Sequence, residues 1–303
     1  MGRIILANDG IAANAKLELE KLGFIVDTTH YDGEELEAKI KEVECIIIRS
    51  ATKIRKDLID IAVGGNLKLM IRAGVGLDNI DVKYAESKGF IVRNTPAASS
   101  RAVAELAIGH MFSLTRHIYI SNINMRNGEW NKKAYKGIEL GGKTLGLIGF
   151  GRISREVASR AMALGMDVIY FDVFGESSIM PECKYVEFDE LLGNSDFISL
   201  HIPYIKEVGT VLGDAEFAKM KDGVYLVDTA RGKVVSEEAL LKALASGKVA
   251  AAALDVYEEE PTRNEAIYTH PKISLTPHIG AATSEAQNRI GIETINIVKE
   301  ILL

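Results

Sequence analysis

Short apolar runs alternate with segments of helical spacing over the first third of the chain. Apolar runs of strand length occupy Ile4–Ala7, Phe24–Asp27, Cys45–Arg49, Leu67–Ala73 and Ile91–Asn94. Between them, segments such as Ala12–Leu22 and Glu34–Val43 repeat apolar residues at helical spacing. Strands that alternate with helices build a parallel sheet, so this region predicts a βαβ domain.

The same rhythm starts again in the second half, after an unusually long apolar segment. Apolar residues continue at helical spacing from Ser99 to Asn127 without a proline, which predicts one long helix crossing between two domains. A polar stretch follows at 127–142. Further strands are expected at Thr144–Gly149, Asp167–Phe171, Phe197–His201, Val224–Asp228, Ala251–Asp255 and Ile273–Thr276, and a final helix at Ser284–Leu303. The fold class is therefore α/β, with two parallel-sheet domains in 303 residues.

Composition and charge narrow the classes of protein to which the chain belongs. Its 47% apolar and 26% charged residues are ordinary for a globular protein. The net charge of -6 gives no general reason for nucleic-acid or membrane binding, and an anionic substrate would need a local cluster of cations. We expect a cytoplasmic protein, because Cys45 and Cys183 cannot form a disulfide framework and no apolar run has the length of a membrane span.

A glycine turn follows the strand predicted at Thr144–Gly149. Gly149 permits a tight bend, and Gly151 lets the backbone approach a pyrophosphate at the N-terminus of the next helix. Ser154 replaces the third glycine of this pattern, and its small size predicts tolerance with some readjustment. Asp172, at the end of the next strand, suits an adenosine ribose and repels a 2′-phosphate. The pattern predicts a Rossmann-like domain that binds NAD rather than NADP; an ordinary βαβ turn with a capping aspartate is the alternative.

Three polar side chains come shortly after apolar strands of the second half. Reducing a 2-keto acid requires a cation for the carboxylate and carbonyl oxygens, which Arg231 would supply. It also requires an acid for the developing alkoxide, and His278 suits that role near neutral pH. Glu260 would orient the imidazole. Each has a simpler interpretation: a loop salt bridge, a structural histidine and a solvated acidic run.

Five motifs together resemble the D-isomer-specific 2-hydroxyacid dehydrogenase family over essentially the whole chain. They are Arg72–Asp81, Gly146–Ile153, Thr229–Gly232, Ala253–Val256 with Glu260–Pro261, and Pro277–Gly280. The resemblance implies that Arg231, Glu260 and His278 are catalytic, that no metal takes part, and that the enzyme is a homodimer or homotetramer. It also implies a discontinuous, flavodoxin-like substrate domain at 1–95 with 284–303, and an NAD-binding domain at 96–283.

The resemblance extends to individual ligand contacts. Implied cofactor contacts are Gly149, Gly151, Arg152, Ile153, Asp172, His201, Ile202, Pro203, Thr229, Ala230, Arg231, Asp255, His278 and Gly280. Implied substrate contacts are Arg49, Ser50, Arg72, Gly74, Val75, Ser99, Lys132 and Gly280, with Lys132 reaching over from a neighbouring subunit. Three departures from the family pattern stand near these positions: Ser154, Asp228 and Lys233.

Within the family, two segments favour the branch that oxidises 3-phospho-D-glycerate in serine biosynthesis. They are Arg49–Lys53, whose arginine and serine would hold the phosphate, and Pro277–Gln287. No C-terminal regulatory domain like that of longer relatives is expected. A glyoxylate, hydroxypyruvate or D-lactate reductase of the same family is the alternative. An NAD-sensing, corepressor-like binding protein is the alternative from another class, because such relatives keep the catalytic residues.

Overall fold

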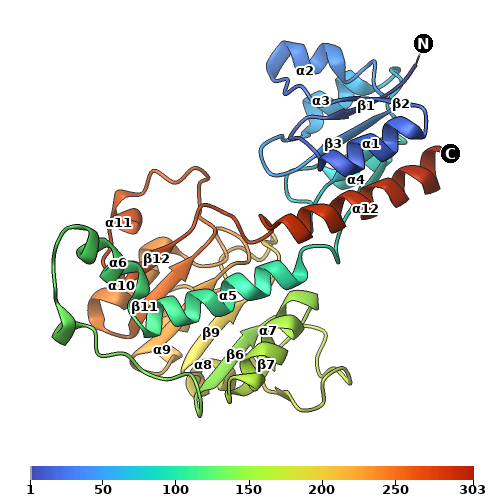
Figure 1. The fold of residues 1–303 in the computed structure, drawn as a ribbon. Coiled ribbons are helices and arrows are strands. Elements are labelled where there is room, and N and C mark those ends of the chain that lie inside the picture. Colours follow the sequence, from blue (N-terminus) through green and yellow to red (C-terminus); the bar gives the residue numbers. More distant parts are fainter. Residues whose placement is uncertain (1) are drawn as a thin grey trace. The chain divides into compact units, whose positions relative to one another are not determined.

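A computed structural model describes residues 2–303 (Figure 1). The chain divides into two compact units. Unit 1 comprises the residues up to Ser99 together with Ala281–Leu303, and unit 2 comprises Ser100–Gly280. Sequence reasoning placed these boundaries at residues 95 and 284. They differ by a few residues because Ser99 and Ala281 pack with the first unit.

Unit 1 is a five-stranded parallel sheet covered by helices on both faces. Its strand order is β2-β1-β3-β4-β5, the flavodoxin-like order. The strands are β1 (Arg3–Ala7), β2 (Phe24–Asp27), β3 (Cys45–Ile48), β4 (Leu69–Arg72) and β5 (Ile91–Asn94). The helices are α1 (Ala13–Lys21), α2 (Gly33–Lys39), α3 (Lys56–Ala62), α4 (Val82–Ser87) and the C-terminal α12 (Ser284–Leu302).

Strand side chains of unit 1 alternate between two apolar layers. Ile5 and Ile47 pack into the layer with α1 and α12, whereas Leu6 and Ile46 pack into the layer with α2, α3 and α4. Strands buried on both faces read as continuous apolar runs, which is why sequence reasoning located them closely. Cys45 lies in this core, and burial raises the pKa of its thiol.

Unit 2 is a seven-stranded parallel sheet, with the order β12-β11-β10-β9-β6-β7-β8. Its first six strands in chain order follow the dinucleotide-binding arrangement, and β12 extends one edge. The strands are β6 (Thr144–Ile148), β7 (Asp167–Phe171), β8 (Lys184–Tyr185), β9 (Phe197–Leu200), β10 (Val224–Asp228), β11 (Val249–Leu254) and β12 (Ile273–Leu275). The helices are α5 (Ser100–Thr115), α6 (Ile118–Arg126), η1 (Lys132–Ala134), α7 (Arg152–Ala163), α8 (Phe188–Asn194), α9 (Asp214–Lys219), α10 (Glu237–Ser246) and α11 (Glu265–Tyr268).

The single long helix predicted from Ser99 to Asn127 is wrong. The chain forms two helices, because His117 adopts a left-handed conformation with φ 54° and stops α5. Helix α5 buries nine residues against the sheet and α7, whereas α6 buries none within the described chain. Apolar spacing continues through this break, so the pattern does not reveal it.

The carboxyl ends of the strands position the residues of interest in both units. Ligands of doubly wound sheets bind where the strand order reverses, which is between β1 and β3 in unit 1 and between β6 and β9 in unit 2. Arg49 follows β3, and the glycine turn follows β6. Each reversal point therefore carries residues that the sequence had singled out.

Candidate active site

The glycine turn after β6 is shaped by close backbone approach. Gly149 has φ 86°, and a Cβ there would lie 2.6 Å from Cγ2 of Ile202 and 2.9 Å from the His201 carbonyl oxygen. Gly151 is the N-cap of α7, whose first N–H groups have no partner within the helix. This end of α7 presents free donors to an anion such as a pyrophosphate.

Ser154 occupies the third glycine position without opening the turn. Its side chain is fully buried, and its hydroxyl donates to the Gly149 carbonyl at 2.5 Å. The hydroxyl therefore ties α7 to the turn where a glycine would only permit close packing. That the turn tolerates Ser154 stays a prediction, and this hydrogen bond supports it.

Asp172 follows β7 and stabilises the same turn. One carboxylate oxygen accepts from the Phe150 N–H at 2.6 Å and the other from the Phe174 N–H at 3.0 Å. A carboxylate oxygen can accept a second hydrogen bond, so both keep capacity for a ribose hydroxyl.

Two buried polar atoms at the ends of neighbouring strands fit a ligand. Nδ1 of His201, after β9, and Oγ1 of Thr229, after β10, have no hydrogen-bond partner among residues 2–303. Burial lowers the pKa of His201 to about 3, so its ring is neutral, with Nε2 lying 3.0 Å from the Ser199 hydroxyl. Unpartnered buried polar atoms are rare, and both belong to residues predicted to contact the cofactor. Together with the glycine turn, they fit NAD.

Glu260 and His278 form a hydrogen-bonded pair. Nδ1 of His278 lies 2.7 Å from Oε2 of Glu260, and because a carboxylate only accepts, the ring donates Nδ1–H. The other carboxylate oxygen of Glu260 accepts from the Tyr257 N–H at 3.3 Å. The two side chains are 36% and 31% exposed, which leaves the pair accessible to a small molecule. No described residue bonds Nε2 of His278, so that nitrogen is the one placed to exchange a proton.

Asp255 holds the loop that carries His278. Its Oδ1 accepts from the Thr276 hydroxyl at 2.6 Å and the Ile279 N–H at 2.8 Å, and its Oδ2 accepts from the Gly280 N–H at 2.9 Å. His278, between these contacts, has φ 53°. Left-handed conformations of non-glycine residues persist where surrounding contacts over-determine them. Asp255 was predicted as a cofactor contact, and the structure gives it this supporting role.

His110 extends this network and was missed as a site residue by sequence reasoning. Its Nε2 lies 3.1 Å from the Thr276 hydroxyl, which already donates to Asp255, so the Nε2–H of His110 donates. Burial lowers the pKa of His110, which favours the neutral ring. A histidine on an apolar helix gives no sequence signal of such a contact.

Arg231 lies on a turn after β10 that packs against the loop carrying Glu260. A Cβ on Gly232 would come within 1.7 Å of the Tyr257 carbonyl oxygen, so only glycine fits there. Nη1 of Arg231 donates to the Ala230 carbonyl at 2.6 Å. Lys233 has φ 69°, a left-handed conformation that glycine adopts more readily than lysine.

Asp228 is a buried carboxyl at the start of this turn. Burial raises its pKa to about 7, and the charges of Asp255 and Glu260 add to that effect. A hydrogen bond from the Ala230 N–H, at 2.9 Å, and the charge of Arg231 act in the opposite direction. The protonation state of Asp228 therefore changes near neutral pH.

In unit 1, the turn that carries Arg49 and Ser50 is held by two polar side chains. Asp9 accepts from the Arg49 N–H at 2.7 Å and the Thr52 N–H at 3.0 Å. The Asn79 amide donates to the carbonyls of the same two residues at 2.6 and 2.7 Å. The Arg49 guanidinium makes no hydrogen bond or ion pair with the described residues, so it does not stabilise this unit through an ion pair.

The other predicted substrate residues lie in both units. Gly74 has φ 154° and packs so closely on the Arg72 guanidinium that a Cβ would fall 1.6 Å from Nη1. Ser99 is buried, and the Val75 carbonyl accepts from the Asn94 amide at 2.5 Å. Lys132 is exposed in η1, and Gly280 lies beside Asp255 in unit 2. Their roles as substrate contacts stay predictions.

Residues 2–303 contain neither a candidate metal centre nor a helix that could span a membrane. No group of three or more histidine, cysteine, aspartate or glutamate side chains within residues 2–303 is placed to hold a metal ion. No helix in the same range has both the length and the apolar character needed to cross a membrane.

Comparison with known proteins agrees with this geometry. Residues 108–280 match the family model for the NAD binding domain of D-isomer specific 2-hydroxyacid dehydrogenases. The chain is 47% identical over 299 residues to a hydroxypyruvate reductase of Thermotoga maritima, which covers 97% of each protein. It is 42% identical over 302 residues to a D-3-phosphoglycerate dehydrogenase of Methanocaldococcus jannaschii, covering 98% of this chain but 57% of that protein.

A solved structure resembles the chain over its length as well. It is a glyoxylate reductase from Paecilomyes thermophila, with a TM-score of 0.89 and 36% identity, covering 98% of this chain and 94% of that one. The matched domain, the relatives and the glycine turn lead to one conclusion. The chain belongs to the D-isomer specific 2-hydroxyacid dehydrogenase family and is an NAD-dependent dehydrogenase.

Proposed function

We propose that the chain interconverts a small D-2-hydroxy acid and its 2-keto acid with Arg231, Glu260 and His278. The observation that carries this proposal is the 2.7 Å contact between Nδ1 of His278 and Glu260, which leaves Nε2 available to the substrate. NAD, when bound, accepts or supplies the hydride. In the oxidative direction neutral His278 accepts the hydroxyl proton, Arg231 holds the carboxylate, and Glu260 stabilises the imidazolium that forms.

For the substrate, we favour 3-phospho-D-glycerate, which is oxidised to 3-phosphohydroxypyruvate. The support is the Arg49 turn, which Asp9 and Asn79 hold at the strand reversal of unit 1 and whose guanidinium has no partner there. An arginine that no carboxylate neutralises, in a chain of net charge -6, suits a phosphate.

Hydroxypyruvate is the second candidate, and a specific observation favours it. The Thermotoga maritima relative that shares 47% identity over 97% of both chains is a hydroxypyruvate reductase. The chain spans just over half of the phosphoglycerate dehydrogenase from Methanocaldococcus jannaschii. The two keto acids differ only by the phosphate on the C3 oxygen, so the two candidate functions differ in whether Arg49 binds a substrate phosphate.

Steady-state rates with D-glycerate, 3-phospho-D-glycerate, D-lactate and glycolate test the proposal. We expect NADH formation with a preference for the phosphorylated acid, and Arg49→Ala to raise KM for that acid about 10- to 100-fold. An unchanged KM would transfer the assignment to hydroxypyruvate. NAD binding without turnover of any acid would instead support the NAD-sensing binding protein.

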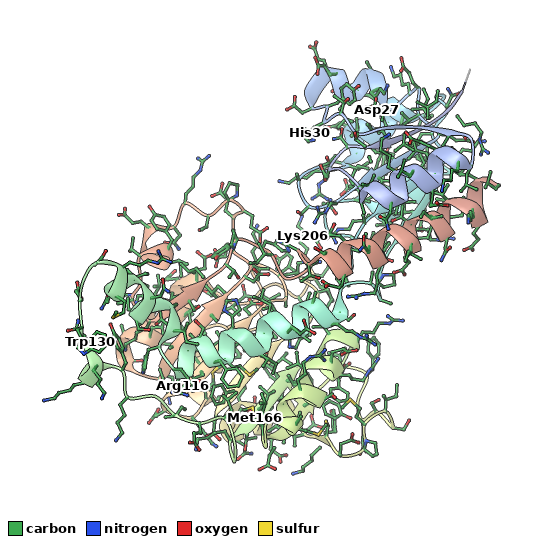
Figure 2. The ribbon with its side chains drawn as sticks, viewed as in Figure 1. Asp27, His30, Arg116, Trp130, Met166 and Lys206 are labelled. Atoms are coloured by element: carbon green, nitrogen blue, oxygen red, sulfur yellow. The ribbon has the colours of Figure 1, made fainter. Side chains whose placement is uncertain are left out.

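We also propose that the chain forms a homodimer or larger oligomer through the surface around α6. Exposed apolar residues on α6 and shortly after it are Ile118, Ile123, Met125 and Trp130, the last at 77%. Figure 2 labels Trp130. Large apolar side chains exposed along one segment are typical of interaction sites. Light scattering after size exclusion should give a dimer or tetramer, and Trp130→Glu should shift it toward the monomer. A monomer at micromolar concentration would contradict the proposal.

A further inference from the structure

Glu237 is the first residue of α10 and, unlike its neighbour, is buried. An acid in the first turn of a helix is normally solvated and acts through the helix dipole. Glu238 follows that rule, since its side chain is 81% exposed and pairs with Lys242. Glu237 is only 8% exposed, and no arginine or lysine among the described residues pairs with it.

The carboxylate of Glu237 instead holds both ends of one loop. Oε1 accepts from the Glu258 N–H at 3.0 Å, and Oε2 accepts from the Asn264 amide at 2.7 Å. In return, the Glu237 N–H donates to the Glu258 side chain at 2.9 Å. A buried carboxylate is tolerated when hydrogen bonds satisfy its oxygens, and here all these donors come from the loop 258–264.

Glu260 lies inside this loop and has little else to fix it. Glu259, Glu260 and Pro261 are exposed, so no apolar packing anchors the segment. The described contacts of Glu260 are the Tyr257 N–H, at 3.3 Å, and His278. Loops with few buried apolar contacts open at low free-energy cost, so the polar contacts at the loop's two ends determine where Glu260 lies.

We propose that Glu237 is a positioning residue that keeps Glu260 against His278 by holding both ends of the 258–264 loop. It touches neither substrate nor cofactor and acts through Glu260. The effect on turnover rests on the proposed function, in which Glu260 stabilises protonated His278.

The variants Glu237→Ala, Glu237→Gln and Glu238→Ala separate this role from a general effect on α10. Glu237→Ala should lower kcat roughly 10- to 100-fold, the size expected when a catalytic group is misplaced, with KM changed less than about twofold because Arg231 is untouched. In Glu237→Gln the side-chain amide oxygen still accepts from the Glu258 N–H. The side-chain N–H of the glutamine donates to the Asn264 amide oxygen once the Asn264 amide has rotated by 180°. Glu237→Gln should therefore keep most of the wild-type kcat. Glu238→Ala should match the wild type.

A double-mutant cycle with Glu260→Ala decides whether Glu237 acts through Glu260. In the Glu260→Ala background, Glu237→Ala should cost less than about twofold in kcat, and both single variants should give kcat–pH profiles of the same shape. Asn264→Ala, which leaves α10 intact, should lower kcat about threefold and lose this effect in the same background. It keeps the test decisive if Glu237→Ala fails to fold.

Two results would overturn the inference. If Glu237→Ala and Asn264→Ala each lower kcat by as much in the Glu260→Ala background as in the wild type, the contacts between Glu237 and the 258–264 loop do not act through Glu260. Full turnover by Glu260→Ala would remove the role of Glu260 itself, and with it this part of the proposed function. The first outcome leaves the proposed function intact, so the two failures are distinguishable.

Discussion

The two units hold a polar loop in the same way, but the loops differ in the side chains that they expose. Each is a parallel sheet with a polar loop at the carboxyl end of a strand, and in each a buried aspartate accepts several N–H or O–H donors from that loop. Asp9 does so for the turn at Arg49, and Asp255 for the loop at His278. Carboxylates that accept backbone N–H groups fix loops which have no apolar packing of their own.

What the loops present differs between the units. Unit 2 presents the hydrogen-bonded pair of Glu260 and His278, and unit 1 presents the Arg49 guanidinium, which has no partner among the described residues. In the proposed function, the first arrangement exchanges the proton and the second selects the substrate. The proposed function therefore predicts that substitutions at the pair alter the reaction and that substitutions at Arg49 alter the choice of substrate.

Among substitutions outside the Glu260–His278 pair, the largest effect is expected from Asp255→Asn. The amide can accept only on one side, so at least one contact among Thr276, Ile279 and Gly280 is lost and His278 leaves its left-handed conformation. We expect kcat to fall about 100-fold, while the dissociation constant of NADH changes less than about threefold. Fluorescence titration measures the latter. If only the affinity for NADH falls and kcat does not, Asp255 acts as a cofactor contact and not as a support of the His278 loop.

Asp228→Asn should change the pH dependence of stability. Because the folded-state pKa of Asp228 is raised to about 7, its contribution to stability is present below its unfolded pKa and is lost as pH rises toward 7. The asparagine variant lacks this loss, so its free energy of unfolding relative to wild type should increase between pH 5 and pH 8 by roughly 1–3 kcal/mol. Urea unfolding at the two pH values checks this. A constant difference would mean that Asp228 is ionised throughout.

Ser154→Ala should have a smaller effect, confined to the turn. It removes the hydroxyl that donates to the Gly149 carbonyl and should lower the free energy of unfolding by about 1 kcal/mol. Thermal unfolding with and without NADH measures it. A variant as stable as wild type would show that this hydrogen bond contributes nothing net.

Lys233→Gly should give the smallest change and the opposite sign. At φ 69° a lysine carries a left-handed strain that glycine lacks, although glycine also loses more entropy on folding. We expect a gain of about 0.5 kcal/mol in the free energy of unfolding. A loss larger than that would indicate contacts of the lysine side chain that offset the strain.

Much of the fold followed from the sequence, and the failures have local causes. Buried parallel strands read as apolar runs, and Gly149 with Gly151 marked the cofactor turn by a pattern that its backbone requires. The break at His117 was not predicted, because apolar spacing continues across it. The buried contacts of Glu237 were not predicted either, because an acid in the first turn of a helix usually faces water.

The candidate pair was predicted unevenly as well. His278 follows an apolar strand and stood out, whereas Glu260 lies in an acidic run, which by itself indicates solvated surface, and became a firm candidate only with the family resemblance. The structure gives a physical reason to pair the two residues, since Glu260 accepts a hydrogen bond from His278. The contacts by which Asp255 and Glu237 hold the neighbouring loops join residues that are far apart in the chain. Contacts between residues far apart in the chain cannot be read from local spacing.

The most direct test compares kcat/KM for 3-phospho-D-glycerate with that for D-glycerate in wild type, His278→Ala and Arg49→Ala. If His278 serves the reaction and Arg49 selects the substrate, His278→Ala should lower both values at least about 1000-fold and leave their ratio within about twofold. Arg49→Ala should lower the ratio at least about tenfold. A ratio that Arg49→Ala leaves unchanged, or that His278→Ala shifts, would contradict the account.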